Sequence, residues 1–129
     1  MTDVRQIRLE PDPLEPYLLS QGFRVGDLVI VSGQAALDEH GDIVGAGDFD
    51  AQAEQVFRNL ARVLEAGGSS LDRVVKVTIF LTDMANFGKI VELRRRWFTP
   101  PYPADTIVEV ASLALPELEI EIEAIAVVR

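Results

Sequence analysis

Hydrophobic residues recur along the chain with two different periods, and the changes of period mark the predicted elements. Within residues 50–68 they recur at helical spacing and form one apolar stripe: Ala53, Val56, Phe57, Leu60, Val63 and Leu64. Asp48 or Asp50 can cap the start of this segment, and Gly67 and Gly68 can end it. The pattern therefore predicts an amphipathic helix that packs on a core.

A second helix is predicted between the Asp83 cap and Phe98, because the proline pair at 100–101 stops it. Its expected core stripe consists of Phe87, Ile90, Val91, the stem of Arg94, and Trp97 or Phe98.

Runs of β-branched residues predict strands over 27–37, 74–81, 105–113 and 118–128, with residues 4–10 as an edge strand. Alternation within the second of these strands puts four side chains on one side: Val75, Val77, Ile79 and Leu81. The segment ALPE between the last two strands is a hairpin or a short crossover. The order of elements predicts one α+β domain over residues 1–129, a mixed sheet with two helices on one face.

Two helices can cover one face of such a sheet, and the other face then needs a partner. In the last strand, one side carries Leu118, Ile120, Ile122, Ala124 and Ala126, and the opposite side carries Glu119, Glu121, Glu123, Ile125 and Val127. The preceding strand has Asp105, Ile107, Glu109 and Ala111 on one side. We expect the uncovered face to hold Ile107, Ile125 and Val127 beside carboxylates. Packing against copies of the same chain buries such a face, so we predict a homo-oligomer.

Composition narrows the classes of function. The net charge of −9 disfavours nucleic acid as a partner, since that binding depends on basic groups. The run Arg94–Arg96 spreads around a helix and is either solvated or paired with carboxylates. The absence of cysteine excludes disulfides and thiolate metal sites, and it fits a cytoplasmic location. We expect no metal, no cofactor and no membrane helix.

Four segments in order carry a family resemblance: RVGDLVIVSGQ, SSLDRVVKVTIFLTDMANF, PYPADTIVEVASLALPE and EIEAIAV. Together they resemble the RidA/YjgF superfamily of imine and enamine deaminases, from about Tyr17 to Val128. The resemblance implies a chorismate-mutase-like α+β subunit and a homotrimer with a ligand cleft at each subunit interface. It also implies hydrolysis of reactive imines to ketones and ammonia without a cofactor.

The resemblance places the family's site residues on this chain. It assigns the glutamate that positions the attacking water to Glu121, the catalytic candidate. Substrate-binding positions fall on Tyr17, Ser32, Gly33, Gln34, Asp105, Ile107 and Val91. Three of these depart from the family: Asp105 stands where the family has a carboxylate-binding arginine, Val91 replaces an asparagine, and Ile107 replaces a frequent cysteine.

The residue change at Asp105 allows three interpretations. Its side chain can cap the turn after Pro103, it can form a carboxylate pair with Glu121 in a cleft, or it can pair with an arginine of Arg94–Arg96. An anion in place of the arginine predicts that carboxylate-bearing imines are poor substrates. The expected function is therefore a Rid-type hydrolytic deaminase of neutral or cationic imines, and the alternative is a non-catalytic small-molecule-binding trimer. A ribonuclease role is disfavoured by the acidic charge.

Overall fold

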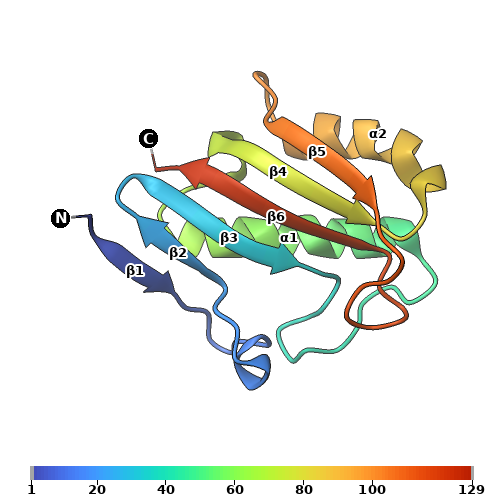
Figure 1. The fold of residues 1–129 in the computed structure, drawn as a ribbon, viewed down its shortest axis with the longest axis horizontal. Helices are drawn as coiled ribbons and strands as arrows, with labels where there is room; N and C mark the ends of the chain where they lie inside the picture. The colour runs from blue at the N-terminus through green and yellow to red at the C-terminus, as the bar shows by residue number, and fades with distance from the viewer. Residues whose placement is uncertain (1, 129) are drawn as a thin grey trace.

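The computed structural model describes residues 2–128, which form a six-stranded mixed sheet with two α-helices packed on one face (Figure 1). The strands are β1 Val4–Ile7, β2 Gly22–Val25, β3 Leu28–Gln34, β4 Val74–Leu81, β5 Ala104–Glu109 and β6 Ile120–Val127. The helices are α1 Phe49–Ala66 and α2 Phe87–Trp97. The predicted fold class, α+β with both helices on one side of the sheet, is confirmed.

Helix α1 supplies the centre of the core, as its sequence predicts. The six residues of its apolar stripe are each at most 1% exposed. The Asp48 side chain accepts a hydrogen bond from the backbone N–H of Ala51, which caps the helix. After Gly67 the chain turns at Gly68, whose φ of +86° suits glycine. The helix covers β3 and β6, the middle of the sheet (Figure 1).

The strand order β1-β2-β3-β6-β4-β5 corrects two details of the sequence prediction. The sequence did not predict strand β2, which pairs with β1 and β3. Gly22–Val25 is only four residues long, so its alternation of apolar and other residues is too brief to indicate a strand. Strand β5 lies parallel to β4 at the sheet edge, and β6 pairs with β3 and β4. The segment between β5 and β6 is therefore a crossover past β4, and the alternative prediction of a hairpin is wrong.

Two predicted stripes are only partly correct. In β4, a register shift between Val74 and Lys76 against β6 buries Val74 and leaves Val75 45% exposed. In α2, Ile90 is buried, whereas Phe87 and Val91 are 44% and 42% exposed. Helix α2 lies against the β5 edge of the sheet (Figure 1). Only a narrow side of this helix therefore contacts the core, and Ile90 lies on that side.

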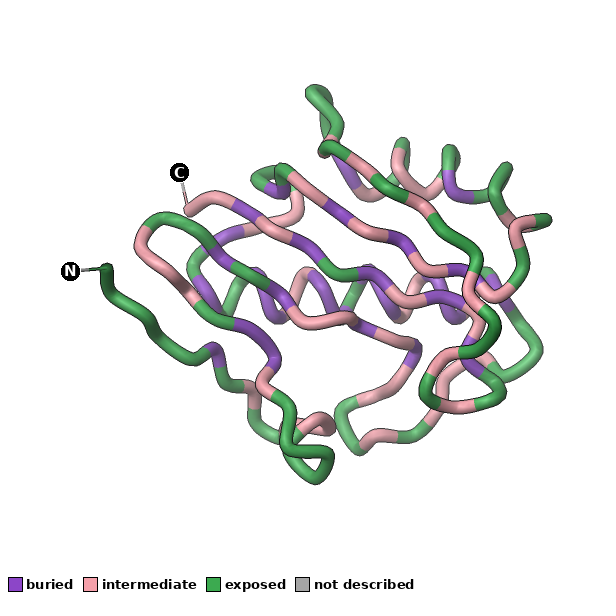
Figure 2. The backbone as a smooth tube through the Cα atoms, in the orientation of Figure 1, coloured by how far each residue is buried: buried purple, intermediate pink, exposed green. Residues whose placement is uncertain are grey.

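Buried and accessible residues alternate along β4 and β6, as Figure 2 shows for the central strands. The face away from the helices, which we call the open face, carries accessible apolar side chains: Phe23, Leu28, Ile30 and Val108, each at least 36% exposed. Ile125 and Val127 lie there as predicted. Ile107 does not, because its register partner Ile79 is fully buried beneath the helices. The predicted place of Ile107 is therefore wrong.

No helix within residues 2–128 is both long enough and apolar enough to cross a bilayer.

Candidate functional site

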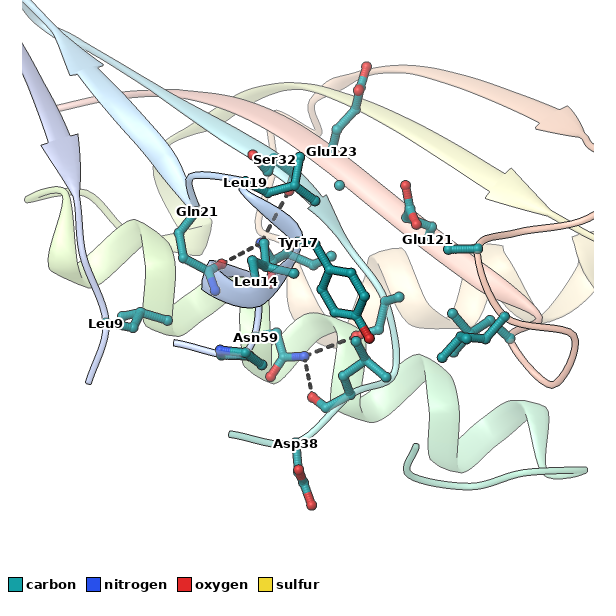
Figure 3. A pocket seen from close by; sticks show the side chains of 18 of the residues that line it. Leu9, Leu14, Tyr17, Leu19, Gln21, Ser32, Asp38, Asn59, Glu121 and Glu123 are labelled. Atoms are coloured by element: carbon teal, nitrogen blue, oxygen red, sulfur yellow. Dashed lines mark hydrogen bonds between the residues drawn. The ribbon is translucent and has the colours of Figure 1, made fainter. Parts of the chain in front are cut away.

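A cavity of about 600 Å³ opens where the N-terminal loop, the end of β3 and the β6 region meet. Five of the residues singled out in the sequence line it: Tyr17, Ser32, Gly33, Gln34 and Glu121. They come from three separate segments of the chain, and Figure 3 shows Tyr17, Ser32 and Glu121 around the same space. Most of the remaining wall is apolar, with Leu14, Leu19, Leu37 and Leu115 among its residues. Such a concave, largely apolar site with few polar groups is typical of small-molecule binding.

Glu121 is a titratable residue of this cavity whose pKa is raised by its surroundings. It lies on the open-face side of β6, and its carboxylate lies directly against Gly33: a Cβ on Gly33 would fall 2.9 Å from the Glu121 Cδ and overlap Oε2. Burial raises the pKa of the Glu121 carboxyl, and the negative charge of Glu123 raises it further. A glutamate with a raised pKa is, when ionised, a stronger proton acceptor than an ordinary surface glutamate.

A chain of side-chain hydrogen bonds fixes the β3 wall of the cavity to the N-terminal loop. Gln34 Nε2 donates to Gln21 Oε1 at 3.0 Å, and Gln21 Nε2 donates to Asp12 Oδ1 at 2.7 Å. Gln34 and Gln21 are 5% and 2% exposed, so each amide has its partner away from water. These bonds hold the β3 bulge between Val31 and Gln34, where Gly33 lies.

Ser32 and Tyr17 take different roles in the wall. The Ser32 hydroxyl donates to the Ser20 carbonyl at 2.5 Å, which again ties β3 to the N-terminal loop. Tyr17 ends the short 3₁₀ helix Glu15–Tyr17 and is 63% exposed, so its ring stands at the accessible side of the cavity (Figure 3).

Three other residues singled out in the sequence do not line this cavity within one chain. Val91 is exposed on α2, and Ile107 packs against the core under the helices. Asp105 is in register with Val77, which is 1% exposed on the helix-covered face, whereas Glu121 is in register with Phe80 on the opposite face. A carboxylate pair of Asp105 and Glu121 within one chain is therefore wrong, because the sheet separates the two side chains. Their roles in an assembled form stay predictions.

The third interpretation of Asp105 is the one that the structure bears out. Arg94 Nε donates to Asp105 Oδ2 at 2.8 Å, with 24% and 16% of the two side chains exposed. This bond joins α2 to the edge strand β5 and matches the negative charge with a positive one. The repulsion of anions that Asp105 alone would exert is thereby reduced. The other oxygen, Oδ1, is buried and has no hydrogen-bond partner within residues 2–128.

Sequence reasoning missed the wall contributed by α1 and by the loop after β3. Asn59 and Arg62 reach the cavity from the side of α1 that does not belong to its apolar stripe. Asp38 reaches it from the loop. The available signal was the spacing of Asn59 and Arg62, three residues apart and so on one helical face.

Comparison with known proteins agrees with this geometry. The family model described as "Endoribonuclease L-PSP" matches residues 7–128, nearly the whole chain. The chain belongs to this family, the Rid (YjgF) superfamily.

Several Rid relatives are similar over almost their full length. A RutC family protein of Pyrococcus abyssi is 43% identical over 117 residues, which cover 90% of this chain and 89% of the relative. A protein of Dermatophagoides farinae named 2-iminobutanoate/2-iminopropanoate deaminase is 36% identical over 120 residues, 93% and 91% of the two chains. The crystal structure of RidA from the Antarctic bacterium Psychrobacter superposes with a TM-score of 0.86 at 36% identity, covering 95% of this chain and 98% of that one.

Proposed function

We propose that this Rid-family chain is a hydrolytic deaminase of reactive imines and enamines. The observation that carries the proposal is Glu121, a partly buried carboxyl with a raised pKa that faces an apolar cavity beside Gly33. The names of two relatives, the iminobutanoate/iminopropanoate deaminase and the chloroplastic Reactive Intermediate Deaminase A of Arabidopsis thaliana, support the reaction class.

In the proposed reaction, water adds to the carbon of a C=N bond and ammonia leaves. Glu121 takes a proton from the attacking water and passes it to the imine nitrogen, giving a neutral carbinolamine. Glu121 then takes the hydroxyl proton of this intermediate and passes it to the nitrogen, so that the C=O bond forms, the C–N bond breaks, and ammonia leaves with Glu121 again ionised. A carboxyl whose pKa is raised above that of an ordinary glutamate suits both transfers, because it is the stronger base when ionised.

The direct experiment generates imines in place with an amino-acid oxidase or an amine oxidase and follows ammonia release and semicarbazone formation. We expect the protein to accelerate ammonia release and to lower semicarbazone formation with at least one imine class. If neither oxidase system gives acceleration, while thermal-shift screening finds a stabilising metabolite, the chain is a binding protein without this chemistry.

Because the matching family model is described as an endoribonuclease, RNA cleavage is the appropriate competing activity to measure. The net charge of −9 disfavours RNA binding, since that binding depends on basic groups that replace counterions along the phosphates. We expect no RNA cleavage at low salt, where basic contacts would be strongest.

We also infer that the chain assembles as a homotrimer through its open face. Phe23, Ile30 and Ile125 are cross-strand neighbours there and form an accessible apolar row. Burying such a row against another copy is favourable, whereas leaving it in water is not. Light scattering at micromolar concentration should give three chains, and Ile30→Asp should lower the mass. A monomeric wild-type protein would contradict the inference.

A further inference from the structure

We propose that Arg62 makes the α1 side of the cavity a binding site for the carboxylate of a small organic acid. This inference rests on the proposed function of the cavity, and it assigns the contact with a substrate carboxylate to Arg62. It also revises the expectation drawn from Asp105, since the cation in this case comes from helix α1 and not from strand β5.

Arg62 is the one basic side chain among the described residues that line the cavity. It is half-buried and has neither an ion pair nor a side-chain hydrogen bond within residues 2–128, although Glu65 lies one turn further along the helix. Other arginines in that part of the chain have a partner: Arg5, Arg24, Arg58, Arg73, Arg94, Arg95 and Arg96. Arg8, the remaining one without a partner, is exposed outside the cavity. A half-buried guanidinium without a counterion favours an anionic ligand.

The backbone that carries Arg62 is fixed relative to the cavity wall. Asn59, one helical turn earlier on the same face, donates from Nδ2 to the carbonyls of Ala35 at 3.0 Å and Leu37 at 2.9 Å. Gln55 Nε2 donates to Asn59 Oδ1 at 2.9 Å, so the amide itself is held in place. These bonds join α1 to the loop after β3, and they fix where the backbone of Arg62 lies relative to the cavity wall.

The other charges of the cavity favour a monoanion over a phosphate. Asp38 accepts hydrogen bonds from the backbone N–H groups of His40 at 2.9 Å and Asp42 at 3.0 Å, and these bonds lower the pKa of its carboxyl. Asp38 therefore stays negative, Glu123 adds a second carboxylate to the lining, and Glu121 adds a third whenever it is ionised. A dianion would be repelled more strongly than a carboxylate. The planar guanidinium fork matches a carboxylate in two parallel hydrogen bonds, and the leucines of the cavity lining suit a short apolar body.

The test compares 2-oxobutanoate with its neutral amide, 2-oxobutanamide, as stable probes in calorimetric titrations. We expect Arg62→Gln to weaken 2-oxobutanoate binding about tenfold or more, and to leave amide binding unchanged. Arg62→Lys, which keeps the charge but loses the fork, should fall between the two. Arg58→Gln is the matched control, because Arg58 lies one turn earlier on α1, outside the cavity, and pairs with Glu54. Equal carboxylate affinity of the wild type and Arg62→Gln, or no wild-type binding at millimolar concentration, would overturn the inference.

Binding and turnover are separable in this design. Glu121→Gln should lose deamination while it keeps 2-oxobutanoate binding, since the carboxylate site does not depend on the acid–base group. If the wild type deaminates no imine but Arg62→Gln still loses affinity, the proposed reaction fails and the carboxylate site stands. If deamination is found and Arg62→Gln retains the wild-type KM for carboxylate-bearing imines, the reaction stands and the role of Arg62 falls.

Discussion

The carboxylate of Glu121 occupies the space that a side chain at Gly33 would need. A Cβ on Gly33 would lie 2.9 Å from Cδ and 3.2 Å from Cγ of Glu121, and it would overlap Oε2. Gly33 is outside the left-handed region, so the backbone itself tolerates alanine at this position. The glycine is therefore explained by the carboxylate beside it and not by a turn.

Gly33→Ala should move the Glu121 carboxylate and impair the proposed deamination. We expect the deamination rate to fall by about 10²-fold or more, the range that a misplaced acid–base group costs. The melting temperature should change little, because a flexible side chain can move aside. Retention of the wild-type rate would show that the position of Glu121 does not matter.

Gly88→Ala is the matched control for this substitution. Gly88 lies in helix α2, and a Cβ there meets no atom within 4 Å. Alanine is the better helix former, so the free energy of unfolding should rise by up to about 1 kcal/mol. The deamination rate should stay at the wild-type value.

The raised pKa of Glu121 predicts how stability depends on pH. Because the folded state disfavours the ionised carboxyl, the folded protein binds more protons than the unfolded one above the ordinary glutamate pKa. The contribution of Glu121 is thus most favourable at low pH and is lost as pH rises through its raised value. Glu121→Gln should gain stability relative to the wild type between about pH 4 and pH 7 in chemical denaturation. A constant difference across this range would contradict the raised pKa.

The bond between Arg94 and Asp105 should be measurable as a coupling energy. Both side chains are largely buried, Arg94 binds Oδ2 of Asp105, and Oδ1 has no hydrogen-bond partner within residues 2–128. Arg94→Met alone leaves a poorly solvated carboxylate and should cost about 1–3 kcal/mol. A double-mutant cycle with Asp105→Asn should give a coupling above about 0.5 kcal/mol by urea denaturation. A smaller coupling would mean that the pair is solvated and weak.

The buried amides behind the cavity should be costly to replace. Gln34→Leu removes the donor to Gln21 Oε1 and leaves that buried acceptor without its partner. We expect a loss of about 1–3 kcal/mol in the free energy of unfolding. Gln6→Leu, which removes an exposed bond to Ser20, should cost much less in the same denaturation experiment. Equal costs would argue that the amide network is not a buried one.

The sequence was most informative where a residue pattern repeats over many residues. The apolar stripe of α1 repeats over several helical turns, and the alternation of β6 repeats over several residue pairs. Each pattern determines which side of its element is buried, and both were predicted correctly. The order of strands depends on contacts between distant segments, so the missed strand β2 and the parallel pairing of β5 could not be deduced from local pattern. Val75 was misplaced because one register shift moves a side chain to the other face.

The site was predictable only in part for a similar reason. The family resemblance led to Glu121, Gly33 and Ser32, which lie together in the cavity. It carried no information on Arg62, because a single arginine on a helix surface usually faces solvent. The Arg94 partner of Asp105 was one of three alternatives, and choosing it required the packing of α2 against the β5 edge.

The central claim is that Glu121 performs the proton transfers of imine hydrolysis. Its most direct test is the rate of ammonia release from an oxidase-generated imine, measured for the wild type, Glu121→Gln and Glu123→Gln. Glu123 lines the same cavity from the same face of β6, so it controls for lost charge. The account predicts that the rate falls about 10²–10⁴-fold for Glu121→Gln. Glu123→Gln should keep a maximal rate near that of the wild type. The pH profile of Glu123→Gln should shift to lower pH, because the charge of Glu123 raises the pKa of Glu121. Equal rates for the wild type and Glu121→Gln would contradict it.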